Sequence, residues 1–209
     1  MFYTKLCSIY DEKDILKREF PFDEFHPLLR KFLMDELKLN ADHFSPYRFA
    51  SYFGIDLKQS IKFFLALSDN QGLFNKIYKY QCSNCEELNI ITDEEDLKNF
   101  ICHECLEPES LENQNFLDEV KIIFELNEEE NELKNSLKAH PFFDKHTSNR
   151  NKSKEGDVNL YFDHLSLGQT LEENEQKDSE GNVYPINSDL AELEREVIKP
   201  LTKGLRKDA

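Results

Sequence analysis

The stretch QCSNCEELNIITDEEDLKNFICHEC, residues 81–105, contains four of the five cysteines of this 209-residue chain. They form two Cys-x-x-Cys pairs, Cys82/Cys85 and Cys102/Cys105, with sixteen residues between the pairs. Two residues between paired cysteines let both sulfur atoms point at one centre, and the longer insert lets the second pair complete a tetrahedron. The spacing therefore predicts one structural Zn²⁺ held by four thiolates, with no coordination position open for chemistry.

Three other uses of these cysteines stay open at this point. They are a pair of disulfides, a redox-active Cys-x-x-Cys, and an iron centre of similar sulfur geometry. His103 stands between the last two cysteines and is expected to be a bystander. Cys7 is remote in sequence and is expected to be a small buried residue, not a ligand.

The composition favours a folded chain, because seventeen Phe and eight Tyr supply material for a core. The sequence starts without a basic segment followed by an apolar run, and no stretch approaches the apolar length of a membrane span. We therefore expect a cytoplasmic protein with no membrane contact. Reduced thiols for a metal fit that compartment.

The net charge of −16 is unevenly distributed. Residues 1–80 hold twelve basic and eleven acidic side chains, whereas residues 81–209 hold fourteen and thirty-one. A phosphate backbone would be repelled by the second part of the chain. The charge thus disfavours a nucleic-acid partner.

Upstream of the cysteines the pattern predicts three helices and a strand. Residues 22–37 place apolar side chains on one helical face, with Pro27 in the first turn. A short helix capped by Ser45 should end at Gly54. A longer helix should follow Asp56, and residues 73–81 should form a strand that leads to the first cysteine pair.

This order of elements is that of a winged helix-turn-helix. The stretch FASYFGIDLKQSIKFFLALSDNQGLFNKIYKYQCSNC, residues 49–85, resembles the winged-helix/zinc-ribbon arrangement of several prokaryotic proteins. The residues that carry the resemblance are Ala50, Gly54, Ile55, Leu65, Gly72, Leu73 and the four cysteines. Such units occur in transcription factors and as protein-binding modules of signalling or defence components, so the resemblance implies an architecture and does not select one function.

Beyond the ribbon, residues 120–126 predict a strand followed by an acidic helix. Residues 104–133 contain eleven acidic side chains and one basic side chain, which form either a solvated face or a docking surface for a basic partner. Residues 147–187 have a linker-like composition interrupted by an apolar patch at 158–167. This patch is either a packing element or an anchor for another subunit, and the candidate anchor residues are Tyr161, Phe162 and Leu165.

No phosphate-binding loop, nucleophile elbow or HExxH motif is present in the sequence. His140, Asp144 and His146 are candidate ligands of a second metal, and Asp163 and His164 could join them, but their spacing does not by itself justify a metal site. The more economical interpretation is that this segment packs against the core.

A nucleic-acid interface is the alternative function. A helix-turn-helix contacts DNA through the start of its second helix, and a wing strand can contact phosphate. The side chains in those places are Lys58, Gln59, Lys62, Lys76 and Lys79.

The sequence as a whole predicts an α+β fold with a winged-helix-like domain, a four-cysteine zinc ribbon, a strand-helix extension and an acidic tail. The expected parts are an N-terminal extension (1–20), the winged-helix-like domain (21–80), the ribbon (81–106), the strand-helix extension (107–146), the linker (147–187) and a C-terminal helix (188–209). The expected function is a non-catalytic, protein-binding accessory or regulatory subunit of a prokaryotic hetero-complex, in a signalling or anti-phage defence context that the resemblance alone suggests. The alternative is a winged-helix DNA- or RNA-binding regulator.

Overall fold

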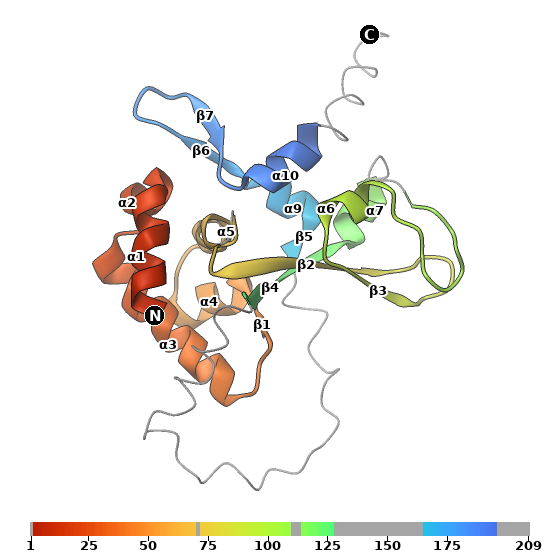
Figure 1. Ribbon diagram of the computed structural model, residues 1–209, viewed down its shortest axis with the longest axis horizontal. Coiled ribbons are helices and arrows are strands. Elements are labelled where there is room, and N and C mark those ends of the chain that lie inside the picture. The colour runs from red at the N-terminus through yellow and green to blue at the C-terminus, as the bar shows by residue number, and fades with distance from the viewer. Residues whose placement is uncertain (1, 70–71, 110–113, 128–164, 196–209) are drawn as a thin grey trace, which may run out of the picture.

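The fold is built on an antiparallel sheet, with α1 to α3 on one side of the molecule and α6 and α7 on the other (Figure 1). The computed structural model describes residues 2–69, 72–109, 114–127 and 165–195. The elements in chain order are α1 (Phe2–Glu12), α2 (Asp14–Glu19), α3 (Phe22–Lys38), β1 (His43–Phe44), α4 (Pro46–Phe53), α5 (Leu57–Leu67), β2 (Phe74–Gln81), β3 (Leu88–Ile91), α6 (Glu94–Lys98), α7 (Gln114–Glu119), β4 (Lys121–Leu126), β5 (Leu165–Ser166), α9 (Leu167–Glu172), β6 (Glu175–Lys177), β7 (Val183–Pro185) and α10 (Ser188–Leu193). The fold class is α+β, as the sequence predicts.

The sheet is organised around the pairing of β2 with β4. The strand order is β1-β4-β2-β3, and β5 also pairs with β4. The register of β2 against β4 runs from Phe74 opposite Leu126 to Lys79 opposite Lys121. All four cysteines of the ribbon therefore lie in an insertion between two strands that pair with each other.

The turns on either side of α5 follow from local sequence. Gly54 ends α4 in the left-handed conformation (φ +66°), and the Asp56 side chain accepts a hydrogen bond from the Gln59 N–H at 3.1 Å to cap α5. A Cβ atom at Gly72 would lie 2.3 Å from the carbonyl oxygen of Leu67, so only glycine fits where the chain returns toward β2.

The predicted elements of this region are present, with two differences. The α3 helix begins at Phe22, which puts Pro27 in its second turn instead of its first. Ser45 occupies the N-cap position of α4, but its side chain makes no capping hydrogen bond. Neither difference alters the path of the chain, because α3 is stabilised by the apolar face that it buries.

Aromatic rings fill the core between α3, α4, α5 and the sheet. The Phe64 ring is stacked on Phe74 at a centroid distance of 5.1 Å and lies edge-on to Phe124 at 5.4 Å. The N-terminal helices extend this core. The ring of Phe20, which follows α2, lies 5.0 Å from the ring of Phe63 on α5, measured between centroids. A continuous cluster of buried side chains therefore joins the N-terminal helices to the sheet. None of the described helices is long and apolar enough to cross a membrane.

The linker predicted over residues 147–187 is wrong for its described part, residues 165–187. Ser166 and Gln169 form a reciprocal capping box that starts α9, and Leu165 pairs with Ile122 of β4. Leu165 and Leu167 are fully buried. The prediction of Leu165 as an exposed partner anchor is therefore also wrong, because its side chain belongs to the core of this chain.

The other predictions for the second half of the chain are tested only in part. The strand expected at residues 120–126 is β4, and it is preceded by the short helix α7. The acidic helix expected after β4 lies outside the described residues. The C-terminal helix expected over 188–209 is present as α10, and the part of this prediction beyond residue 195 also lies outside the described residues.

A buried cation ties α10 to the sheet and to the ribbon. The Lys76 ammonium group on β2 donates to Asn187 Oδ1 at 3.0 Å and to Asp189 Oδ2 at 2.8 Å, and it lies 3.2 Å from Glu94 Oε1. Glu94 in turn accepts a hydrogen bond from the Tyr78 hydroxyl at 2.6 Å, and burial together with the Glu94 charge raises the pKa of Tyr78. The Lys76 cluster, defined by these five residues, joins β2, α6 and α10.

We expect Lys76→Ala to lower the free energy of unfolding by about 2–3 kcal/mol, because it leaves two carboxylates without their buried counter-charge. This loss in the free energy of unfolding is smaller than that expected for a fully buried ion pair, because the Asp189 side chain is 44% exposed. Lys79→Ala is the matched control on the opposite face of the same strand and should change stability by less than about 0.5 kcal/mol. Urea denaturation of both variants measures the difference, and equal effects would contradict the assignment.

Candidate metal centre

The two cysteine pairs adopt the same local structure. In the first, the Cys82 N–H donates to the Glu87 carbonyl and the Glu86 N–H donates to the Cys82 carbonyl, both at 2.9 Å. In the second, the Cys102 N–H donates to the Glu107 carbonyl and the Leu106 N–H donates to the Cys102 carbonyl, both at 3.0 Å. Each turn closes on its own first cysteine, so the two sulfur atoms of a pair are directed to one point.

A left-handed residue follows each pair. Glu86 has a φ of +61° and Leu106 a φ of +60°, a conformation that glycine adopts without strain. Both positions carry side chains with a Cβ atom, and Leu106 is 71% exposed. The tight turns that orient the cysteines are therefore kept at a cost in backbone strain.

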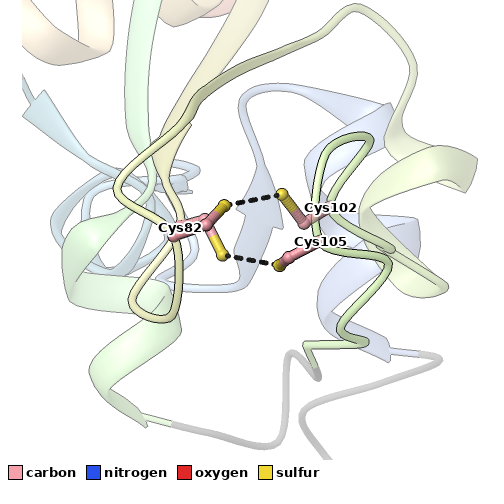
Figure 2. Close-up of side chains that lie close together, drawn as sticks. Cys82, Cys102 and Cys105 are labelled. Carbon is pink, nitrogen blue, oxygen red and sulfur yellow. Dashed lines mark hydrogen bonds between the residues drawn. The ribbon is translucent and has the colours of Figure 1, made fainter.

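The four sulfur atoms converge between the two turns, and Figure 2 shows those of Cys82, Cys102 and Cys105 directed toward one another. Cys82 Sγ lies 3.6 Å from Cys105 Sγ, and Cys85 Sγ lies 3.6 Å from Cys102 Sγ. All four ligand atoms lie within 4.8 Å of one another. A tetrahedral shell with metal–sulfur bonds of about 2.3 Å has sulfur–sulfur edges of about 3.8 Å, whereas a disulfide bond is about 2.05 Å long. The arrangement is compatible with a metal ion, and the cysteines are not paired as disulfides.

Electrostatics within the cluster also favours a cation. The backbone N–H groups of Cys105 and Glu104, together with the Asn89 amide, lower the pKa of the Cys102 thiol to about 6. The pKa of Cys85 is raised to about 12, because burial and the adjacent cysteine sulfur atoms outweigh the opposing effect of the Glu87 N–H. Four thiolates at these distances repel one another, so ionising all of them requires a positive charge between them.

Asn89 is a supporting residue that the sequence analysis missed. Its buried amide group lies 3.6 Å from Cys102 Sγ and also donates to the Glu87 carbonyl at 3.1 Å. Its carbonyl oxygen accepts the His103 N–H at 3.2 Å and lies 2.7 Å from His103 Nδ1. Asn89 thus joins the two cysteine turns, and His103 contributes to that link without belonging to the four-sulfur cluster.

The turns are also joined to the sheet by a small aromatic core. The Tyr80 ring lies 4.6 Å from Phe116 and 5.4 Å from Phe100. Its hydroxyl donates to Glu109 Oε1 at 2.8 Å, and the Ser83 hydroxyl donates to the same oxygen at 2.9 Å. The first cysteine turn is therefore fixed to the chain that leaves the second.

The residues predicted to contact nucleic acid do not form one open basic surface. Lys58 forms an ion pair with Glu173 at 2.8 Å, and this contact raises the pKa of the Lys58 ammonium group. Gln59 and Lys62 are half-buried. Lys76 is buried and bound to the carboxylates described above, so its predicted phosphate contact is wrong. Lys79 is half-buried on the opposite sheet face from Lys76.

Most of the remaining sequence candidates lie outside the described residues. Tyr161 and Phe162, the other two predicted partner anchors, lie outside the described residues. So does the candidate second metal site at His140, Asp144 and His146, with Asp163 and His164. Cys7 lies on α1 and is half-buried, separate from the four-cysteine cluster.

A cleft of about 710 Å³ opens beside the Lys76 cluster. Its polar lining includes Lys76, Glu94 and Asp189. These charged groups bind one another, as described above, and therefore support the attachment of α10. We assign no reaction to this cleft.

Comparison with known proteins gives no further identification, because no protein-family model, no curated protein and no solved structure matches this chain.

We expect Cys102→Ser to reduce metal binding and lower the melting temperature by about 10 °C or more, because binding at such a site contributes directly to folding. Cys7→Ser is the control and should retain both metal content and most of the stability. Metal analysis and thermal denaturation with and without a chelator measure these effects. A metal-free wild type of unchanged stability would contradict the assignment.

The left-handed residues give a second, independent test. Leu106→Gly should raise the free energy of unfolding by about 1 kcal/mol, because the strain is relieved and an exposed side chain loses few contacts. Leu106→Ala removes the same contacts but keeps the strain, so it should not be stabilising. Denaturation of the metal-loaded protein separates the two variants, and equal stabilities would show that the turn is not strained.

Proposed function

We propose that this chain is a non-catalytic, protein-binding accessory or regulatory subunit stabilised by one structural Zn²⁺. The observation that carries the proposal is the convergence of four cysteine sulfur atoms. Four thiolates fill a tetrahedral shell, so a bound ion would have no open position for water or substrate. Its contribution would be to folding.

Zinc is the metal that the ligand set favours. The bipartite Cys-x-x-Cys spacing is typical of structural zinc sites, although iron accepts the same sulfur geometry. The iron form would absorb visible light, whereas zinc is colourless because its d shell is full. We expect about one zinc ion per chain and no visible absorption in protein purified from its native host. The thiols also favour a reducing compartment, and we place the protein in the cytoplasm.

The topology supports a winged-helix-like unit. The order α3, β1, α4, α5, β2, β4 is helix, strand, two helices and two strands, and β4 lies between β1 and β2 in the sheet. In this interpretation β2 and β4 form the wing, and the zinc ribbon is inserted at its tip. Such units in other proteins include protein-binding modules of signalling and defence systems, and we propose a prokaryotic multi-protein system of that kind as the context.

The charges favour a protein partner over nucleic acid. Of the five side chains considered for nucleic acid, Lys58 and Lys76 already bind carboxylates within the chain. Phosphate contacts require unpaired cations, and the net charge of −16 opposes the approach of a polyanion. The nucleic-acid-binding regulator remains the second candidate because α5 has the position of a recognition helix.

The proposal predicts that a tagged chain expressed in its native host co-purifies with a protein partner at a fixed stoichiometry. It also predicts weak binding to duplex and single-stranded nucleic acid at physiological salt. Under the alternative, binding would be sub-micromolar, would fall steeply as salt rises, and would be abolished by Lys58→Glu together with Lys62→Glu. Mass spectrometry of the complex and fluorescence anisotropy at several salt concentrations distinguish the two functions.

A further inference from the structure

The strand β3 forms an open edge of the sheet within the described part of the chain. It pairs with β2 through Leu88 opposite Gln81 to Ile91 opposite Tyr78. On its other side no described strand pairs with it, since β3 ends the strand order. Figure 1 shows this edge on the part of the molecule that projects away from α1 to α4. An open edge can accept another strand.

The direction of the backbone groups on β3 follows from the hydrogen-bond pattern. The Cys82 N–H donates to the Glu87 carbonyl, which makes these two residues a hydrogen-bonded pair. Hydrogen-bonded and non-hydrogen-bonded pairs alternate along an antiparallel ladder. Asn89 and Ile91 therefore bond to β2, whereas the backbone groups of Leu88 and Ile90 point toward the open edge.

The same two residues also expose apolar side chains. Leu88 is 47% and Ile90 is 61% exposed, while the intervening Asn89 and the following Ile91 are buried. Leu88 and Ile90 lie on one sheet face because side chains alternate along a strand. The β3 edge, defined here as Leu88 and Ile90, thus presents backbone groups that pair with no described strand, next to two exposed apolar side chains.

Charges at both ends of this edge indicate what can bind to it. Residues 86–96 contain six acidic and no basic side chains, and exposed carboxylates lie on both sides of the apolar pair: Glu86 and Glu87 before it, and Asp93, Glu95 and Asp96 after it. One of them has a cationic neighbour, since Glu95 contacts Lys98 at 2.6 Å, and Glu87 lies 3.8 Å from the His103 ring. The remaining charge is still negative at both ends.

This distribution disfavours a second copy of the chain. Two copies paired antiparallel through β3 would bring the acidic residues before one strand against those after the other, and like charges across a ladder are destabilising. A strand with apolar residues at its centre and basic residues at its ends would instead be complementary. Lys79 lies on β2 beside Ile90, so the centre of the incoming strand should not be basic.

We propose that the β3 edge binds an extended segment of a partner protein that adds a strand to the sheet. The segment carries apolar residues opposite Leu88 and Ile90 and basic residues on both sides of them. This inference rests on the proposed protein-binding function and assigns it a surface. The contact area is small, so the isolated segment should bind with a dissociation constant of roughly 10–100 µM.

The probe is the blocked peptide Lys-Lys-Val-Thr-Val-Thr-Val-Lys-Lys, compared with the same peptide carrying Glu in place of Lys. The basic peptide should bind to the metal-loaded, full-length protein and the acidic one should not. Amide hydrogen exchange followed by NMR tests the geometry. The amides of Leu88 and Ile90 should become protected on binding, while those of Asn89 and Ile91, already bonded to β2, should change little.

Ile90→Pro removes the outward N–H donor. Proline is tolerated on an edge strand where its missing N–H faces solvent, so the pairing with β2 should persist. This variant should retain its metal and bind the basic peptide at least about tenfold more weakly. Val183→Thr with Tyr184→Thr is the control on β7, because these side chains are similarly exposed, at 52% and 49%, and it should leave binding unchanged. If the Ile90→Pro variant loses its metal, the double variant Leu88→Thr with Ile90→Thr is used in its place. Reduced binding of the basic peptide is again expected.

Several results would overturn the proposal. The first is equal binding of the acidic and basic peptides. The second is undiminished binding of the basic peptide by the metal-loaded Ile90→Pro variant, and the third is no binding of the basic peptide to wild type. Protection of the Leu88 and Ile90 amides in the free protein would also overturn it: if this depended on concentration the edge would pair with a second copy, and otherwise with another part of the chain.

Purification of the complex from the native host distinguishes a failure of this inference from a failure of the proposed function. A stoichiometric protein partner retained equally by wild type and Ile90→Pro would refute the β3 edge and leave the proposed function standing. Strong, salt-dependent nucleic-acid binding without a protein partner would refute both.

Discussion

The pairing of β2 with β4 is the constraint on which the rest of the structure depends. It holds Lys79 opposite Lys121, so the chain between them, which includes β3, must extend from this pair of residues and return to it. The aromatic core of that excursion is small within the described residues and consists of Tyr80, Phe100 and Phe116. A short segment with so small a core needs a cross-link. The four converging sulfur atoms are compatible with a metal ion, which would supply such a cross-link in this segment.

The features that the sequence predicted are those encoded locally. The spacing of Cys82, Cys85, Cys102 and Cys105 predicted their convergence because each pair is oriented by its own turn. Gly54 and Asp56 marked the boundary between α4 and α5 because helix caps act within a few residues. Local signals of this kind do not depend on the rest of the fold.

The predictions that failed concerned contacts between residues far apart in sequence. Residues 165–187 have a polar composition, and what folds them is the pairing of Leu165 with Ile122 and the burial of Leu167. Lys76 looked like a surface cation because its partners Asn187 and Asp189 are more than a hundred residues away. Asn89 stood in a strand pattern as an ordinary polar residue, and only its contacts with Cys102 and His103 show its role. Periodicity contains no information on such pairings.

The same contacts also explain why α4, α5 and β2 present no open basic surface within the described part of the chain. The Lys58 and Lys76 ammonium groups bind carboxylates that follow them by more than a hundred residues, so their charges stabilise the attachment of the C-terminal elements. At β3 the pairing with β2 and the contact of Asn89 with Cys102 hold one side of the strand in place, and the other side pairs with no strand among the described residues. Natural proteins commonly protect such an edge with charge. Here the acidic side chains lie at the two ends of β3 and leave Leu88 and Ile90 exposed between them, which discourages self-pairing while keeping the edge accessible to a strand of opposite charge.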